Sequence, residues 1–321
     1  MRAIIDVRGV RKKYRKSKRP ALDGISFQVE EGAIYAFVGP NGAGKTTTIR
    51  ILATLLRFDG GMARIGGYPV NTHPREVRRL VGYIPDEFGL YGEMLAPEYL
   101  DFFARCYGIV PAKRGKMVAD LLDLVGLTHR AGDEVRALSR GMRQRLGLAR
   151  ALVHDPALIV ADEPAAGLDP RARVELREIF RLLQELGKTI FLSSHVLQEL
   201  DEIATHIGIV EAGRLVTSGS LDEIRARLRP HHRVRVTLLR DTADAQAWLA
   251  QHEGILGVES LPPANGDVSD PALLITLAGD SEAVVGLLAE LVRAGFPVLS
   301  YVEERETLES LFLNLTQGIV S

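Results

Sequence analysis

Residues 33–46 read AIYAFVGPNGAGKT, an apolar run that leads directly into a glycine-rich loop. The run AIYAFVG (33–39) has the character of a buried strand, and the loop after it opens a helix. A GxxxxGKT loop in this context wraps phosphates with its backbone N–H groups, while its lysine reaches the β and γ oxygens and its threonine holds Mg²⁺. The stretch therefore predicts a nucleotide site that includes Gly39, Pro40, Asn41, Gly42, Ala43, Gly44, Lys45, Thr46 and Thr47.

A second apolar run, LIVADEP (158–164), delivers two carboxylates at the carboxyl end of a strand. Asp162 is placed to hold Mg²⁺ through water, and with Thr46 it makes up the expected metal site. Glu163 is free to orient or deprotonate an attacking water molecule. Because a strand ending in Asp-Glu can also be an ordinary solvated strand end, these roles depend on the phosphate loop being present.

The segment LSRGMRQRLGLARAL (138–152) predicts another helix whose N-terminus suits an anion. Ser139 is a good N-cap, and apolar residues recur after it at helical spacing. The free N–H groups and the dipole of such a helix end favour negative charge, and Gly141 would let a ligand approach the backbone. The chain thus carries two helix ends suited to phosphate, far apart in sequence.

Up to about residue 220 the chain alternates short β-type runs with helical stretches, which predicts an α/β fold on a largely parallel sheet. The runs at 33–39, 158–163 and 189–194 lack polar alternation, so we expect them to be buried on both faces. A hairpin turning at 211–213 follows, and the capping-box sequence at 220–223 opens a short helix that ends before Pro230. We expect the first domain to span residues 1–229.

Beyond Pro230 the pattern changes to two βαβ units and a final helix, TLESLFLNL (307–315). This order predicts a small, separate α+β domain over residues 230–321. The helix expected over 281–295 and the final helix each have one apolar face. Core packing is the expected use of both faces, and a partner surface is the alternative.

Composition narrows the class of protein. The 321 residues are 46% hydrophobic, enough for a sizeable core, and the formal net charge of −1 gives no sign of a nucleic-acid partner. No apolar run approaches the ~18 residues of a membrane span, and the first residues lack the apolar centre of a signal peptide. The single cysteine, Cys106, fits a reducing compartment and is expected in the core. The basic run 11–19 is expected to be a solvated loop, with attraction to triphosphate or anionic lipid as alternatives.

These motifs, in this order, resemble the ATP-binding subunit of an ABC transporter over residues 1 to about 229. LSRGM (138–142) matches the signature motif of that family, and GLD (167–169) matches the loop after the second carboxylate. Tyr14 occupies the position of the aromatic residue that stacks on adenine. The resemblance implies a P-loop NTPase fold with a helical subdomain at about 87–154, and hydrolysis of ATP with Mg²⁺. It implies the catalytic residues Lys45, Glu163 and His195, the last as the switch histidine.

The same resemblance explains why the chain has two helix N-termini suited to binding phosphate. In this family the signature end faces away from its own phosphate loop and caps the γ-phosphate of ATP held by a second copy. The Ser139 hydroxyl and the Gly141 N–H would then act on that second copy's ATP. The implied partners are a second copy and an integral membrane permease, which would hold the chain on the cytoplasmic face of the membrane.

The chain departs from the family pattern at two places. Arg140 and Met142 stand where many members have glycine and glutamine, a combination closest to drug-resistance and type-two exporter subunits. Asp86 replaces the glutamine that many members use to sense Mg²⁺ and the membrane partner, and we keep it as a candidate nucleotide-site residue because a carboxylate can bind hydrated Mg²⁺. The expected function is an ATPase that dimerises on ATP and powers export. Alternatives are a soluble ABC-type ATPase acting on ribosomes or DNA, and a regulator that only binds nucleotide; the single uninterrupted cassette and the intact Glu163 and His195 argue against them.

Overall fold

The computed structural model describes residues 3–86, 89, 91–194, 200, 202–228, 231–261, 272–279 and 281–304, without the side chains of 225–228, 231 and 281. The chain divides into two compact units, residues 1–221 with 312–321 and residues 222–311. The units separate at the beginning of helix α7 (Leu221–Leu228), whereas the boundary predicted from the sequence falls just after its end. Within the described ranges no helix is both long enough and apolar enough to cross a membrane.

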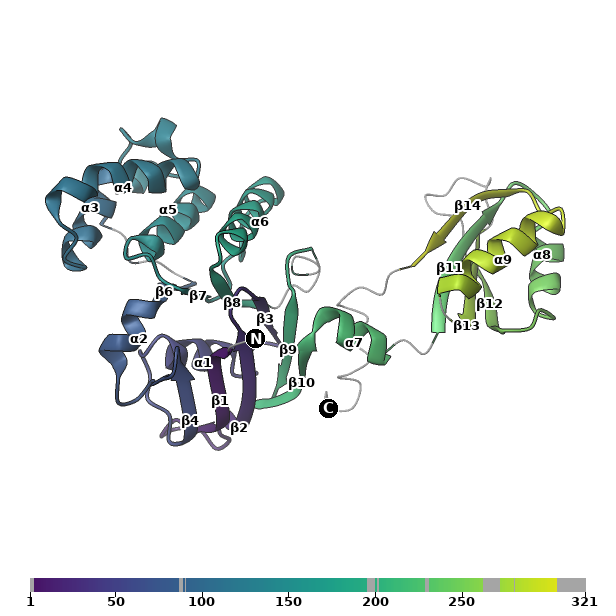
Figure 1. Ribbon diagram of the computed structural model, residues 1–321, viewed down its shortest axis with the longest axis horizontal. Helices are drawn as coiled ribbons and strands as arrows, with labels where there is room; N and C mark the ends of the chain where they lie inside the picture. Colours follow the sequence, from purple (N-terminus) through teal and green to yellow (C-terminus); the bar gives the residue numbers. More distant parts are fainter. Residues whose placement is uncertain are drawn as a thin grey trace. The chain divides into compact units, whose positions relative to one another are not determined.

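A six-stranded sheet forms the centre of the first unit, in the order β10-β9-β3-β8-β7-β6 (Figure 1). Its strands are β3 (Ile34–Val38), β6 (Val81–Ile84), β7 (Leu158–Ala161), β8 (Thr189–Ser194), β9 (His206–Glu211) and β10 (Arg214–Ser220). All neighbours pair in parallel except β9 and β10, which form the predicted hairpin. Every residue of β3, β7 and β8 is buried, so the α/β fold and its buried strands are confirmed.

A second sheet in this unit is antiparallel, which the sequence analysis did not anticipate. It has the order β2-β1-β4-β5 and contains β1 (Ala3–Lys12), β2 (Leu22–Glu30), β4 (Gly60–Ile65) and β5 (Tyr68–Pro69). Aromatic rings join the two sheets: Phe27 of β2 lies 5.8 Å from Tyr35 of β3 and 5.7 Å from Phe191 of β8, between ring centroids. The run 11–19 at the turn between β1 and β2 is almost entirely exposed, as expected for a solvated loop.

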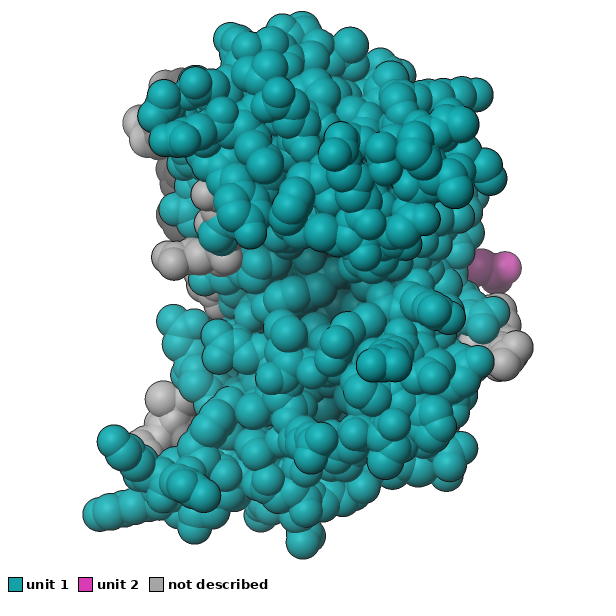
Figure 2. All heavy atoms as spheres, turned by 90° about the vertical axis from the view of Figure 1, so that its left-hand side faces the viewer, with its two compact units in different colours: residues 1–221, 312–321 teal, residues 222–311 magenta. Residues whose placement is uncertain are grey.

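Three helices, α3 (Ala96–Cys106), α4 (Pro111–Leu124) and α5 (Arg140–Leu152), form the predicted helical arm. The arm lies together on one side of the sheets, whereas α1 (Lys45–Leu52), α2 (Pro74–Leu80) and α6 (Pro170–Glu185) lie closer to the strands (Figure 1). Figure 2 shows that the unit is hollowed between the arm above and α2 below. The prediction that Cys106 packs in the core was wrong, because the buried stripe of α3 ends at Ala104 and Cys106 is exposed at the helix end.

After α7, the described part of the second unit is an antiparallel sheet with helices against it, in the order β12-β13-β11-β14. Its elements are β11 (His231–Leu238), α8 (Thr242–Leu249), β12 (Ile255–Leu261), β13 (Ala272–Ala278), α9 (Ser281–Arg293) and β14 (Val298–Glu303). The two predicted βαβ units interleave, because β13 lies between β11 and β12 while β11 lies between β13 and β14. One face of α9 packs in the core of this unit, and the predicted helix 307–315 lies outside the described residues.

Candidate active site

The glycine-rich loop joins β3 to α1, as the sequence predicts, and its glycines are required by its shape. Gly44 is the N-cap of α1 with φ 108°, and Gly42 has φ 83°, both in the left-handed region that favours glycine. A Cβ on Gly39 would lie only 2.1 Å from the carbonyl oxygen of Val210. The loop is therefore held against β9 between a buried strand and a helix, the context in which backbone N–H groups of such loops bind phosphate.

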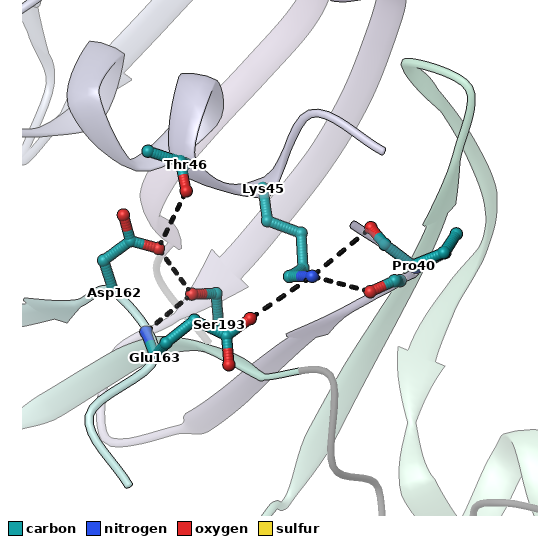
Figure 3. A network of polar contacts seen from close by, with 7 residues as sticks. Pro40, Lys45, Thr46, Asp162, Glu163 and Ser193 are labelled. Atoms are coloured by element: carbon teal, nitrogen blue, oxygen red, sulfur yellow. Dashed lines mark hydrogen bonds and ion pairs between the residues drawn. The ribbon is translucent and has the colours of Figure 1, made fainter. Parts of the chain in front are cut away.

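Lys45 is the cation of this loop. Its side chain is 6% exposed, and its Nζ donates to the carbonyl oxygen of Gly39 at 2.6 Å and lies 3.3 Å from Oε1 of Glu163 (Figure 3). The lysine and the second carboxylate of LIVADEP, separated by more than a hundred residues in sequence, thus meet at the mouth of the phosphate loop. The ammonium group lies where phosphate oxygens would compete for it.

The two carboxylate residues follow β7 and are joined to the neighbouring strand by Ser193. Thr46 Oγ1 donates to Asp162 Oδ1 at 3.3 Å, and Ser193 Oγ donates to the same oxygen at 2.8 Å. The backbone N–H of Glu163 donates to Ser193 Oγ at 2.9 Å. Burial raises the pKa of Asp162, and the hydrogen bonds from Ser193 and Thr46 oppose that rise because they favour the ionised form.

The sequence analysis did not identify Ser193. A visible signal existed, since TIFLSS ends in two serines after an otherwise apolar run. Its importance depends on strand register, however: β7 and β8 pair in parallel with Ala161 opposite Leu192, which brings the next residues, Asp162 and Ser193, side by side. No pattern along the chain gives that register.

A pocket of about 470 Å³ collects most of the predicted nucleotide residues. Tyr14 and Asp86 line it, and the Tyr14 hydroxyl lies 3.4 Å from Oγ1 of Thr47. Gly39 and Ala43 shape the loop without lining the pocket, since Ala43 is buried. The remaining predicted residues that line it are Pro40, Asn41, Gly42, Gly44, Lys45, Thr46, Thr47 and Glu163. Adjacent hydroxyl and carboxylate oxygens of Thr46 and Asp162 are the donor type that Mg²⁺ prefers, so the residues fit a nucleotide with its metal ion.

Ser139 and Gly141 line a different pocket, of about 560 Å³, which shares no lining residue with the first. Ser139 is the N-cap of α5, as predicted, and its Oγ accepts the N–H of Met142 at 3.2 Å. A Cβ on Gly141 would lie 2.8 Å from the Cβ of Ala172 in α6. Gly141 therefore permits close packing of two helices, a role that the sequence analysis did not foresee.

The loop after the second carboxylate also borders this end of α5. Asp169 caps α6 by accepting the N–H of Ala172 at 2.9 Å. The Arg140 guanidinium covers Gly167, which has φ 67°, so that a Cβ there would lie 2.7 Å from Cζ of Arg140. The unusual signature residue Arg140 thus packs on the GLD loop of its own chain. His195 lies outside the described residues.

Comparison with known proteins decides the family. Residues 22–166 match the family described as "ABC transporter". The chain is 31% identical over 313 residues to the linearmycin resistance ATP-binding protein LnrL of Bacillus subtilis (strain 168), covering 98% of each chain. It is 36% identical over 312 residues to the daunorubicin/doxorubicin resistance ATP-binding protein DrrA of Streptomyces peucetius, covering 97% of this chain and 92% of that one.

This chain belongs to the ABC transporter family. A solved structure described as the ATP binding subunit of an ABC transporter is 32% identical, with a TM-score of 0.63, and the match covers 70% of this chain and 93% of that chain. This ABC protein is therefore an ATP-binding ATPase with the P-loop NTPase fold, as its sequence predicted. The match to LnrL extends over nearly the whole chain and so includes the second unit, whereas the match to the solved structure covers 70% of the chain.

Proposed function

We propose that two copies of this ABC ATPase close around two ATP molecules, each held between the phosphate loop of one copy and the signature end of the other, and that this closure powers a separate membrane permease for export. The observation that supports the proposal is that Lys45, at the N-terminus of α1, and Ser139, at the N-terminus of α5, line two different pockets of one chain. Because a single copy offers Ser139 and Lys45 to different pockets, a second copy is needed to bring both to one phosphate.

The residues of the first pocket divide the chemistry among them. Lys45 and the loop N–H groups hold the β- and γ-phosphates, while Thr46 and Asp162 hold Mg²⁺. A bound Mg²⁺ supplies charge neutralisation at the phosphates. Glu163 orients the attacking water and accepts its proton; its carboxylate is 15% exposed and reaches the phosphate side of the pocket, where it contacts Lys45. We propose His195 as a further donor to the γ-phosphate on the family resemblance alone.

The signature end completes the site across the dimer. Ser139 Oγ accepts the Met142 N–H, so its own proton can be directed to a phosphate oxygen. The first N–H groups of α5, Gly141 among them, lack partners within the helix and add further donors and the positive end of its dipole. These groups stabilise charge on the γ-phosphate during transfer.

A groove of about 1,230 Å³ between the arm and α2 is our proposed docking site for a cytoplasmic segment of the permease. Tyr107 and Val110, 47% and 53% exposed, line it together with the cationic side chains of Arg79, Lys113 and Lys116. ATP-binding subunits of this family act in general with a membrane subunit, and similarity to the Nod factor export ATP-binding protein I of Ralstonia nicotianae, 32% identical over 316 residues, supports export as the direction. Val110→Glu should weaken retention on membranes that carry the permease, whereas Val174→Glu, at an exposed valine of α6, should not.

Mixing two inactive variants tests the shared site. Lys45→Ala disables the phosphate loop and Ser139→Arg blocks the signature end, so either variant alone has two defective sites per dimer. A mixed dimer places both lesions in one site and leaves the other intact, so random pairing restores up to roughly a quarter of wild-type sites. If Ser139 served the ATP of its own chain, no pairing could rebuild a complete site and the mixture would stay inactive.

Strict coupling between the two sites could silence a mixed dimer, so ATP-driven dimerisation is measured beside turnover. The expected result is a dimer in ATP for the mixture and for the wild type. Wild-type ATPase that stays constant per chain on dilution, in a sample shown by sizing to be monomeric with ATP, would refute the proposal.

A further inference from the structure

The hydroxyl of Ser193 lies between the two residues on which hydrolysis depends. Its side chain is fully buried, and its oxygen lies 2.8 Å from Asp162 Oδ1 and 2.9 Å from the backbone nitrogen of Glu163 (Figure 3). The backbone N–H can only donate, so Ser193 accepts that bond. Its one proton therefore goes to Asp162, and the direction of both hydrogen bonds is fixed.

The unusual backbone conformation at Glu163 indicates what its hydrogen bond to Ser193 stabilises. Glu163 has φ 47°, in the left-handed region that non-glycine residues rarely adopt, and β7 ends two residues before it, at Ala161. The Glu163 carbonyl accepts the N–H of Ala166 at 3.0 Å, so the chain turns immediately after the carboxylates. A conformation of this kind persists only when its surroundings hold it, and the Ser193 hydroxyl holds the N–H side of the turn.

We propose that Ser193 is a positioning residue for ATP hydrolysis. Its one hydroxyl orients a carboxylate oxygen of Asp162, the proposed metal ligand, and fixes the backbone turn on which Glu163 lies. The inference rests on the roles proposed above for these two carboxylates. Thr46 donates to the same Asp162 oxygen, so the P-loop threonine and the β8 serine together set the rotation of that carboxylate. Losing the serine leaves Asp162 with one of these two hydroxyl donors and leaves the Glu163 N–H without its acceptor.

A matched pair of variants separates this role from general stability. Ser193→Ala removes the hydroxyl at the carboxylates. Thr189→Val removes another buried hydroxyl of the same strand, which accepts the backbone N–H of Gly32 at 2.9 Å, about 13 Å along the strand from Ser193. Each change deletes one acceptor of a backbone N–H, but only the first touches the carboxylates. Ser193→Cys keeps the volume with a weaker donor and serves if the alanine variant does not fold.

The experiment measures ATP binding in EDTA, the Mg²⁺ concentration for half-maximal turnover, and kcat and KM for ATP in each purified full-length variant. For Ser193→Ala we expect kcat about 10–100-fold lower and a raised half-maximal Mg²⁺ concentration. Metal-free ATP binding should stay at the wild-type level, because the phosphate loop is untouched. Thr189→Val should match the wild type in all of these measurements, and Ser193→Cys should fall between serine and alanine.

Two results would overturn the inference. Ser193→Ala with the kcat and Mg²⁺ dependence of Thr189→Val would show that the hydroxyl positions nothing. A loss of metal-free ATP binding in folded Ser193→Ala and Ser193→Cys would assign Ser193 to the shape of the whole pocket instead. If Glu163→Gln retains wild-type turnover, the proposed function of Glu163 fails first; if Glu163→Gln is inactive and Ser193→Ala is normal, only the inference about Ser193 fails.

Discussion

Gly141→Ala gives a stringent check on the packing of the signature helix. Gly141 lies in the first turn of α5, and a Cβ there would lie 2.8 Å from the Cβ of Ala172 in α6. Carbon atoms in contact prefer roughly 3.5–4.0 Å, so the two helices would have to separate by roughly 1 Å. On helix propensity alone, alanine in place of glycine stabilises a helix by up to about 1 kcal/mol. The two effects have opposite signs, and the structure decides which is larger.

The cost is expected to exceed the gain. Forcing an extra methyl group into a close-packed contact costs about 1–3 kcal/mol, so the net loss is about 1 kcal/mol. In a unit of this size that lowers Tm by roughly 2–4 °C. Gly115→Ala is the matched control, because Gly115 is exposed within α4 and a Cβ there meets nothing within 4 Å. This control should raise Tm by a similar amount.

Calorimetry is the suitable assay. The only tryptophan, Trp248, belongs to the second unit, so tryptophan fluorescence would not report on the unfolding of the first unit, which contains Gly141. Adding Ala172→Gly to Gly141→Ala should recover part of the lost stability, because it removes the opposing methyl group. A Gly141→Ala protein as stable as Gly115→Ala, or a second substitution that restores nothing, would refute the claim that Gly141 is a helix-contact glycine.

Three further outcomes follow from the site and the fold. Glu163→Gln should lower turnover by about 10²–10⁴-fold and keep the ATP affinity, because Lys45 and the glycine-rich loop remain. Single-turnover kinetics and equilibrium ATP binding measure the two quantities. Wild-type turnover in this variant would remove Glu163 from the mechanism. A fragment of residues 1–229 should still fold and bind ATP, and a fragment that does neither would place the domain boundary elsewhere. Burial lowers the pKa of His154, whose Nε2 lies 3.1 Å from the Val81 carbonyl oxygen, so the folded protein favours the neutral imidazole. The stability that the neutral imidazole contributes is present above the pKa of His154 in the unfolded chain, about 6.5, and is lost as the pH falls below it. Tm should therefore fall more steeply between pH 7 and pH 5 in the wild type than in His154→Phe, and equal slopes would contradict this.

The first unit shows where reasoning from sequence succeeds. The strand–loop–helix structure around Gly39–Thr46 was predicted correctly because it depends on neighbouring residues: glycines with positive φ, a buried strand before them and a helix after them. Ser139 was assigned correctly as an N-cap for the same local reason. The second sheet was missed because strand direction is set by pairing partners, such as Ile5 with both Val29 and Ile65, and not by the strand's own residues.

The sequence by itself determined the fold class, the order of the motifs and most of the residues that line the pocket at the glycine-rich loop, because each rests on a short pattern with a local physical cause. Only the tertiary structure decided which distant residues meet. The register of β7 with β8 brings Ser193 to Asp162, and the close approach of α5 and α6 gives Gly141 its packing role. The interleaving of β11–β14 is likewise a choice among pairings of similar strands. Such contacts depend on the summed packing of the whole core, which no single segment encodes.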